Sequence, residues 1–171
     1  MDRFFNTAGP TITQDHYHIP PLQRVDWVEL QHLMATKRYF VLHAPRQTGK
    51  TSTLLAMMAE LNGSGHYACA YANIEGAQAA RGDATQGIPA ACNAIARSVA
   101  LYLSQPELLA WYQQHSDKLP AQDQLTALLQ QWCKLSPLPT VLLLDEVDAL
   151  VGDTLISLLR QIRAGYAQRP E

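Results

Sequence analysis

Hydrophobic residues recur at helical spacing over much of this chain. Residues 25–36 place Trp27, Leu30 and Met34 on one face, and Asp26 falls in the first turn, where a negative charge is favourable. The same spacing predicts further helices: residues 49–61, most of residues 84–136, and a last one that begins at Asp153. In the region 84–136, Pro89 can occupy a first helical turn. Two apolar stripes there are expected to face the core: Cys92, Ile95, Val99 and Tyr102, and then Leu125, Leu128, Leu129 and Trp132. The last helix is expected to direct four apolar side chains inward: Leu155, Ile156, Leu159 and Ile162.

Three short apolar runs lie between these helices and favour β-strands. They comprise residues 39–43, 66–74 and 140–144, and the third is apolar on both faces, as strands of parallel sheets are. Turn-forming residues at 62–65 separate the second helix from the second strand. Strands that alternate with helices predict an α/β fold with a parallel sheet.

Composition narrows the class of protein. The 171 residues are 47% hydrophobic and carry a net charge of −2, so the chain can bury a core and lacks the basic surface of a typical nucleic-acid binder. No stretch has the roughly 18 apolar residues that a membrane helix needs, and the first thirty residues lack the apolar region of a signal peptide. We therefore expect a cytoplasmic protein with no membrane partner, for which nucleic acid is a disfavoured partner.

The cysteines and histidines do not predict a zinc site or a disulfide framework. Cys69, Cys92 and Cys133 are odd in number and widely spaced, so we expect small core residues in a reducing compartment. His16 and His18 form an H-x-H pair for which the sequence offers no further ligands.

Residues 44–51 (APRQTGKT) join a predicted strand to a predicted helix, as a phosphate-binding loop requires. Backbone N–H groups there can surround an anion at the positive end of the helix, Lys50 can neutralise the β- and γ-phosphates, and Thr51 can ligate Mg²⁺. Ala44 stands where the usual pattern has glycine, and a glycine-capped helix start with a solvated lysine is the alternative. The predicted nucleotide-binding residues are Gln47, Thr48, Gly49, Lys50, Thr51 and Ser52.

Two adjacent carboxylates end the third apolar run. Asp145 is placed to hold Mg²⁺, directly or through water, and Glu146 can orient or deprotonate an attacking water. Seen alone, the pair could be two exposed acids at a strand end, but the upstream loop favours the nucleotide-site interpretation.

These two segments resemble the Walker A and Walker B motifs of the AAA+ and STAND-like ATPases, including AAA-like ATP-binding proteins of bacteria. Residues 5–10 (FNTAGP), 43–51 (HAPRQTGKT) and 73–76 (NIEG) are similar to the bacterial group. The resemblance implies a three-layer P-loop NTPase fold that binds ATP and Mg²⁺. It also implies that Asn73 turns Glu146 toward or away from water as a catalytic switch, with loop capping as the alternative.

The resemblance further suggests an organisation into an N-terminal arm (1–24) and a P-loop ATPase domain (25–171) with a helical segment at 84–136. Residues 18–22, with Arg24, fall where such proteins wrap the adenine, although a proline-rich surface arm is an equal alternative. AAA+ sheets place a later strand between the first and third strands found here. We therefore expect an incomplete sheet in a truncated ATPase that hydrolyses ATP poorly alone and self-associates, unless residues 140–145 pair directly with 39–43.

The function expected from the sequence is Mg²⁺-dependent ATP hydrolysis that drives a conformational switch. A GTPase would carry Asp-x-x-Gly after the third strand and an Asn-Lys-x-Asp base reader, and neither is present. The alternative is a non-hydrolysing module that binds ATP through Lys50 and Thr51 and contacts a protein partner through residues 84–136.

Overall fold

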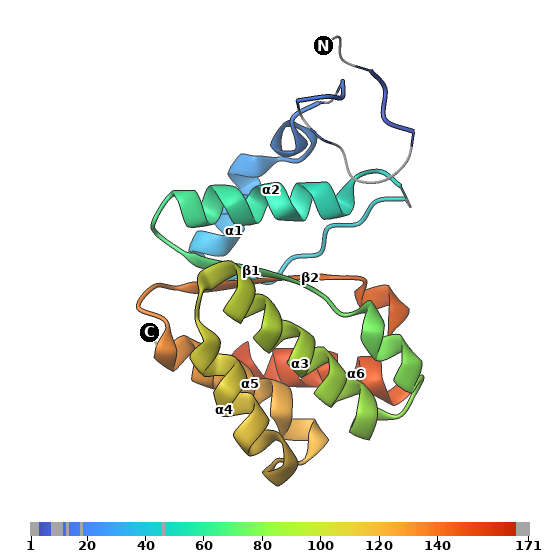
Figure 1. The fold of residues 1–171 in the computed structure, drawn as a ribbon, viewed down its shortest axis with the longest axis vertical. Coiled ribbons are helices and arrows are strands. Elements are labelled where there is room, and N and C mark those ends of the chain that lie inside the picture. Colours follow the sequence, from blue (N-terminus) through green and yellow to red (C-terminus); the bar gives the residue numbers. More distant parts are fainter. Residues whose placement is uncertain (1–3, 8–11, 13, 18, 46, 167–171) are drawn as a thin grey trace. The chain divides into compact units, whose positions relative to one another are not determined.

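The computed structural model describes residues 4–7, 12, 14–17, 19–45 and 47–166. Helices make up most of the chain, and one parallel sheet of two strands makes the fold mixed α/β (Figure 1). The chain divides into two compact units: an amino-terminal unit, Met1–Glu60, and a carboxy-terminal unit, Leu61–Glu171.

The helices of the amino-terminal unit form where the hydrophobic spacing predicts them. A 3₁₀ turn, η1 (Pro21–Arg24), leads into α1 (Trp27–Ala35), and α2 (Lys50–Gly63) follows the candidate phosphate loop. The Asp26 side chain accepts a hydrogen bond from the Glu29 N–H at 3.0 Å, so it caps α1. Both predicted helices are therefore confirmed.

The predicted strand at residues 39–43 is wrong. The segment belongs to no strand, and Tyr39 and Val41 are 52% and 88% exposed. A run of β-forming residues becomes a strand only when a neighbouring strand satisfies its backbone groups. Among the described residues no strand pairs with this segment, so the alternative in which it pairs with residues 140–145 is also wrong.

The two remaining predicted strands are confirmed and lie side by side. β1 (Ala68–Asn73) and β2 (Thr140–Asp145) pair in parallel, with Ala68 opposite Thr140 and Asn73 opposite Asp145. Asn62 orders the entry to β1, because its side-chain amide accepts from the Cys69 N–H at 2.8 Å and donates to the Cys69 carbonyl at 3.0 Å. The register brings the carboxyl ends of both strands to the same edge of the sheet.

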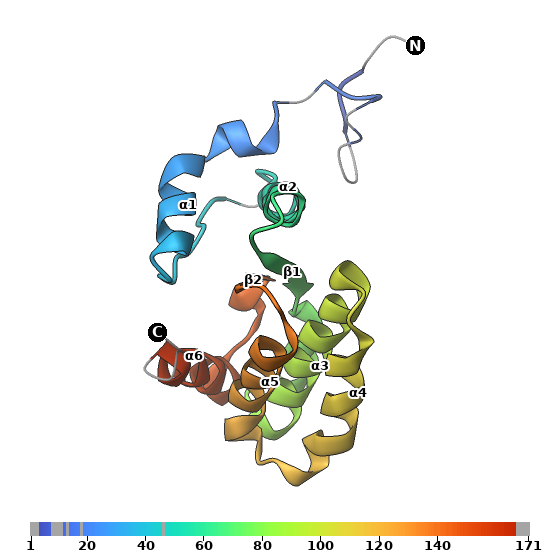
Figure 2. The same cartoon turned by 90° about the vertical axis from the view of Figure 1, so that its left-hand side faces the viewer.

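Four helices lie on one side of this sheet, and α3 packs directly against β1 (Figures 1 and 2). They are α3 (Ala84–Leu103), α4 (Pro106–His115), α5 (Ala121–Leu135) and α6 (Gly152–Tyr166). Short 3₁₀ turns connect the elements: η2 (Glu75–Ala80), η3 (Ser116–Lys118) and η4 (Val147–Ala149). The helical prediction for residues 84–136 is thus confirmed, and the helical segment forms the crossover between the two parallel strands.

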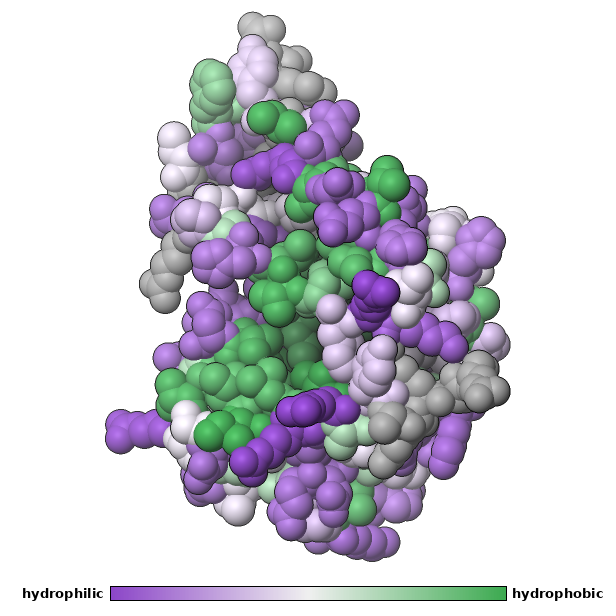
Figure 3. Space-filling model, turned by 180° about the vertical axis from the view of Figure 1, so that it is seen from behind, coloured by the Kyte–Doolittle hydropathy of each residue, from purple (hydrophilic) through white to green (hydrophobic). Residues whose placement is uncertain are grey.

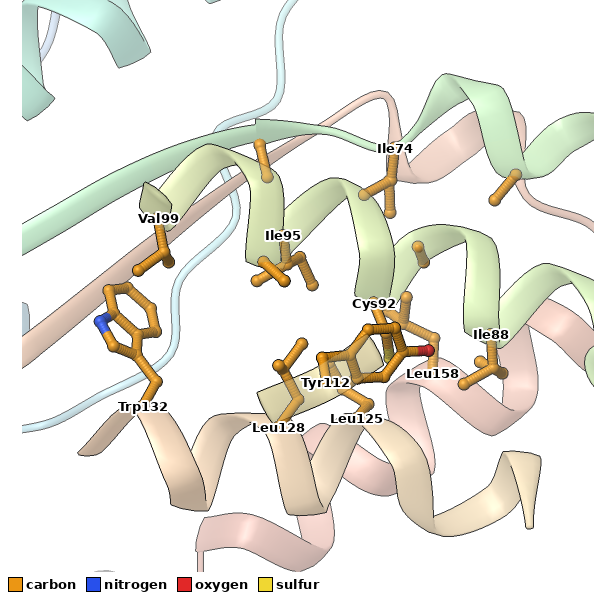
Figure 4. Packing of buried hydrophobic residues seen from close by; sticks show 14 of the residues in the cluster. Ile74, Ile88, Cys92, Ile95, Val99, Tyr112, Leu125, Leu128, Trp132 and Leu158 are labelled. Carbon is orange, nitrogen blue, oxygen red and sulfur yellow. The ribbon is translucent and has the colours of Figure 1, made fainter. Parts of the chain in front are cut away.

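The core of the carboxy-terminal unit lies between the sheet and these helices (Figure 4). Ala70 and Ala72 face it from β1, and Ile74, Ile88 and Leu158 also belong to it. Both predicted stripes contribute buried residues: Cys92, Ile95, Val99, Leu125, Leu128 and Trp132. Tyr102, predicted on the buried face of α3, is 37% exposed instead, because it lies in the last turn of that helix. Cys69 and Cys92 are buried as predicted, whereas Cys133 is exposed.

The buried face of α6 differs from the predicted one. Thr154, Leu158 and Gln161 are buried, Leu155 and Ile162 are partly buried against the core, and Ile156 and Leu159 are 47% and 51% exposed. Hydrophobic side chains accordingly gather on the surface over α6 (Figure 3). Periodicity identified the helix correctly, but the neighbouring elements decided which face is buried.

Pro89 also departs from its predicted place. It was expected in a first helical turn, but α3 begins at Ala84, because the Asp83 side chain caps it by accepting from the Thr85 N–H at 2.8 Å. Pro89 therefore lies in the second turn, where it cannot donate the hydrogen bond to the Thr85 carbonyl that a regular α-helix would contain.

Candidate functional site

The candidate phosphate loop of the amino-terminal unit has an unusual backbone. Gln47 and Gly49 have φ of 60° and 83°, and helical geometry begins at Lys50. Left-handed residues in a turn can bring successive N–H groups together in an anion-binding concavity, and the start of α2 adds unsatisfied N–H groups. This local geometry fits the predicted use of the segment.

The side chains of the loop bond to its own backbone. The Lys50 ammonium donates to the Ala44 carbonyl at 3.0 Å and to the Pro45 carbonyl at 3.2 Å. The Thr48 hydroxyl also donates to the Pro45 carbonyl, at 2.7 Å. The lysine side chain therefore lies across the loop.

Arg24 also contacts this loop. Its Nη2 donates to the Thr48 carbonyl at 2.5 Å, and its Nη1 lies 2.7 Å from where a Cβ on Gly49 would be. Glycine at position 49 adopts the positive φ without strain, and a Cβ there would require the flexible end of the Arg24 side chain to move. The resemblance placed Arg24 with an adenine-wrapping segment, and its contact with the loop was not predicted.

The other predicted nucleotide-binding residues lie in the first turn of α2. Thr51 is exposed and Ser52 is half-buried. Thr53 secures the turn, because its N–H and its hydroxyl both donate to the Gly49 carbonyl, at 3.0 and 3.1 Å. The loop and the first turn of α2 thus bring the six predicted residues together in one short segment.

The two carboxylates stand where β2 ends in the carboxy-terminal unit. Asp145 is buried, its Oδ2 accepts from the Tyr71 hydroxyl at 3.0 Å, and its Oδ1 accepts from the Glu146 N–H at 3.0 Å. Glu146 is half-buried and left-handed, with φ 60° and ψ 34°. This conformation is rare for residues other than glycine and concentrates at functional sites.

Asn73 lies opposite Asp145 in the sheet register, as expected for a polar residue that ends the neighbouring strand. Its Oδ1 accepts from the Glu75 N–H at 2.8 Å, so the side chain caps the turn into η2. The loop-capping interpretation is thus supported by a hydrogen bond in the structure, and the switch role of Asn73 stays a prediction.

The donor set fits magnesium better than a metal that needs a protein cage. Mg²⁺ prefers oxygen ligands and is usually bound by one or two carboxylates together with substrate phosphates. Asp145 and Glu146 supply carboxylate oxygens in the carboxy-terminal unit, and within the described ranges no group of three His, Cys, Asp or Glu residues could hold a metal. His16 instead accepts from the Ile12 N–H at 2.9 Å and packs edge-on against Phe4, while His18 lies outside the described residues.

The sequence patterns gave Tyr71 no role, and they did not predict the contact of Arg24 with the loop. Tyr71 precedes Asn73 by two positions, so alternation along a strand places both on one face. That pattern could have drawn attention to Tyr71, but its hydrogen bond to Asp145 depends on the register between β1 and β2. For Arg24 no local pattern predicted the contact with Thr48.

No family model, curated protein or solved structure matches the chain. In the part of the chain that the structure describes, no helix is both long and apolar enough to cross a membrane.

Proposed function

We propose that this chain is an ATP-binding module of the P-loop NTPase fold that hydrolyses ATP with Mg²⁺ and uses the cycle to drive a conformational switch. The observation that carries the proposal is the loop before α2, in which Lys50 lies 3.0 Å from the Ala44 carbonyl and two residues adopt positive φ. A strand end with two carboxylates, Asp145 and Glu146, supports it.

In this proposal the loop binds the phosphates through the N–H groups of residues 47–52 and through Lys50. Thr51 and Asp145 would hold Mg²⁺, which when bound neutralises the charge of the phosphates. Glu146 orients the water that attacks the γ-phosphorus and accepts its proton. A bond forms between the water oxygen and phosphorus, the bond to the bridging oxygen breaks, and ADP leaves with that electron pair.

The binding half of the proposal is tested by Lys50→Ala, with Lys134→Ala as the matched control. Lys134 is exposed in the last turn of α5, so its removal changes the net charge equally. A hydrogen bond to a charged group is worth roughly 1.5–3 kcal/mol, so ATP affinity should fall about ten- to a hundred-fold in the Lys50 variant alone. Calorimetry with ATP measures this, and equal affinity in the parent and the Lys50 variant contradicts a phosphate site.

The catalytic half is tested by Glu146→Gln, with Asp145→Asn for comparison. Glutamine has the shape of glutamate but cannot accept the proton, so turnover should be lost while ATP binding is kept. Asparagine at 145 should instead raise the Mg²⁺ concentration that binding requires. If the parent binds ATP but releases no phosphate, the chain is the non-hydrolysing interaction module, and if Glu146→Gln hydrolyses at the parent rate, Glu146 is not the base.

A further inference from the structure

The Asp145 carboxylate accepts a hydrogen bond from Tyr71, to which the proposed function assigns no role. Tyr71 lies opposite Leu143 in the parallel register, and Asp145 is two positions further along β2. Residues at such diagonal positions share a face of the sheet, and a long aromatic side chain can span the separation. The 3.0 Å hydrogen bond from the Tyr71 hydroxyl to Asp145 Oδ2 is therefore a consequence of the register.

Two donors act on the Asp145 carboxylate from different directions. The Glu146 N–H bonds Oδ1 from within the same chain segment, whereas the Tyr71 hydroxyl bonds Oδ2 from the neighbouring strand. A carboxylate that accepts from one donor can still rotate about its Cβ–Cγ bond, but bonds to both oxygens restrict that rotation. The Tyr71 side chain is buried, and its ring meets Tyr102 edge-on, with 6.4 Å between the ring centroids.

We propose that Tyr71 is a positioning residue that holds the Asp145 carboxylate in the orientation that receives Mg²⁺. The inference rests on the proposed function, because it assigns Tyr71 a part in the same site. Tyr71 touches neither metal nor nucleotide, and it acts only through Asp145.

The test is Tyr71→Phe, which removes the hydroxyl and keeps the ring. A fluorescent ATP analogue is titrated into the protein once with excess Mg²⁺ and once with EDTA. The ratio of the two affinities measures how much Mg²⁺ contributes to nucleotide binding, and the measurement does not depend on ATP hydrolysis. Loss of a hydrogen bond to a charged group should lower this affinity ratio on the order of tenfold. The affinity measured in EDTA should stay that of the parent, because the metal is absent there.

Two controls separate positioning from a general loss of structure. Tyr102→Phe removes the hydroxyl of the adjoining ring, which is 37% exposed, and should leave the ratio unchanged. In an Asp145→Asn background Tyr71→Phe should lower the ratio no further, because its effect passes through the carboxylate. Thermal unfolding of each variant reports stability separately.

The outcomes distinguish the two claims. If the parent binds the analogue equally well with Mg²⁺ and EDTA, or does not bind it, the proposed metal–nucleotide site is wrong and the role of Tyr71 is rejected with it. If the parent shows the Mg²⁺ effect and Tyr71→Phe keeps it in full, or lowers it equally in the Asp145→Asn background, only the positioning role is overturned.

Discussion

Three residues of the two candidate segments hold a left-handed backbone: Gln47, Gly49 and Glu146. The conformation costs roughly 1–2 kcal/mol in a residue with a Cβ, so the backbone at Gln47 and at Glu146 lowers the stability of the folded state by about that amount. Glutamine at 146 keeps this cost, and for that reason Glu146→Gln changes the chemistry of the side chain with little change to the fold.

At the residue scale, we predict that Gly49→Ala and Gly65→Ala destabilise the protein similarly but differ in nucleotide binding. Both glycines have positive φ, +83° and +71°, so each alanine should cost about 1 kcal/mol. No atom lies within 4 Å of a Cβ at Gly65, whereas a Cβ at Gly49 displaces the Arg24 guanidinium from the loop.

Denaturant unfolding and ATP calorimetry on both variants check this prediction. Only Gly49→Ala should weaken ATP binding, because it changes the loop that carries Lys50. Parent affinity in Gly49→Ala would show that the loop tolerates the change and that Arg24 does not shape it.

At the element scale, the orientation of α6 follows from one polar side chain. Gln161 Oε1 accepts from the Leu125 N–H at 2.9 Å, and its Nε2 donates to the Ala121 carbonyl at 3.1 Å. These are the N–H and the carbonyl that a regular α-helix would pair with each other in the first turns of α5. The Gln161 amide finds its partners there, and the orientation of α6 that buries it leaves Ile156 and Leu159 on the surface.

The adjacent residues Leu158 and Leu159 provide a matched test of this orientation. Leu158 is 0% exposed and Leu159 is 51% exposed. Leu158→Ala should cost about 2–5 kcal/mol of unfolding free energy, because it opens a cavity in the core, and Leu159→Ala should cost under about 1 kcal/mol. Equal losses in denaturant unfolding would contradict this orientation of α6, and a larger loss in Leu159→Ala than in Leu158→Ala would mean that α6 buries the face predicted by hydrophobicity alone.

At the scale of the whole molecule, the core contains groups that keep their protons at high pH. Burial raises the pKa of the Cys69 and Cys92 thiols from about 9 to about 12. Burial also raises the pKa of Tyr112, whose hydroxyl donates to Gln124 Oε1 at 2.7 Å. In the unfolded chain the thiols ionise near pH 9, so between about pH 9 and pH 12 the folded state binds more protons than the unfolded state.

We therefore predict that stability is intact below about pH 9 and falls above it, by about 1.4 kcal/mol per pH unit for each buried thiol. Denaturant unfolding at a series of pH values measures the slope. Cys92→Ala should reduce the slope of unfolding free energy against pH by the contribution of one thiol. It should also lower the unfolding free energy at neutral pH, because it removes part of a core side chain. Cys133→Ala, at an exposed position, serves as the control, and a slope unaffected by Cys92→Ala would refute the assignment.

Much of the candidate site could be predicted from the sequence, because its geometry is local. Residues 47–52 form one loop and helix start, and Asp145 and Glu146 end one strand, so spacing alone placed them. The contacts of Arg24 with Thr48 and of Tyr71 with Asp145 join positions 24 and 74 residues apart. No local pattern contains such pairs.

The sequence by itself determined which segments are helices and that strands form within residues 66–74 and near 140–144, because periodicity and propensity act over a few neighbours. Tertiary structure decided the rest. Residues 39–43 have strand-forming side chains, but among the described residues they pair with no strand, so they remain irregular. The buried face of α6 includes Thr154 and Gln161, which hydrophobicity would place outside, because Thr154 donates to the Arg81 carbonyl and Gln161 bonds α5. A polar group is buried where a distant partner satisfies it, and only the assembled fold supplies that partner.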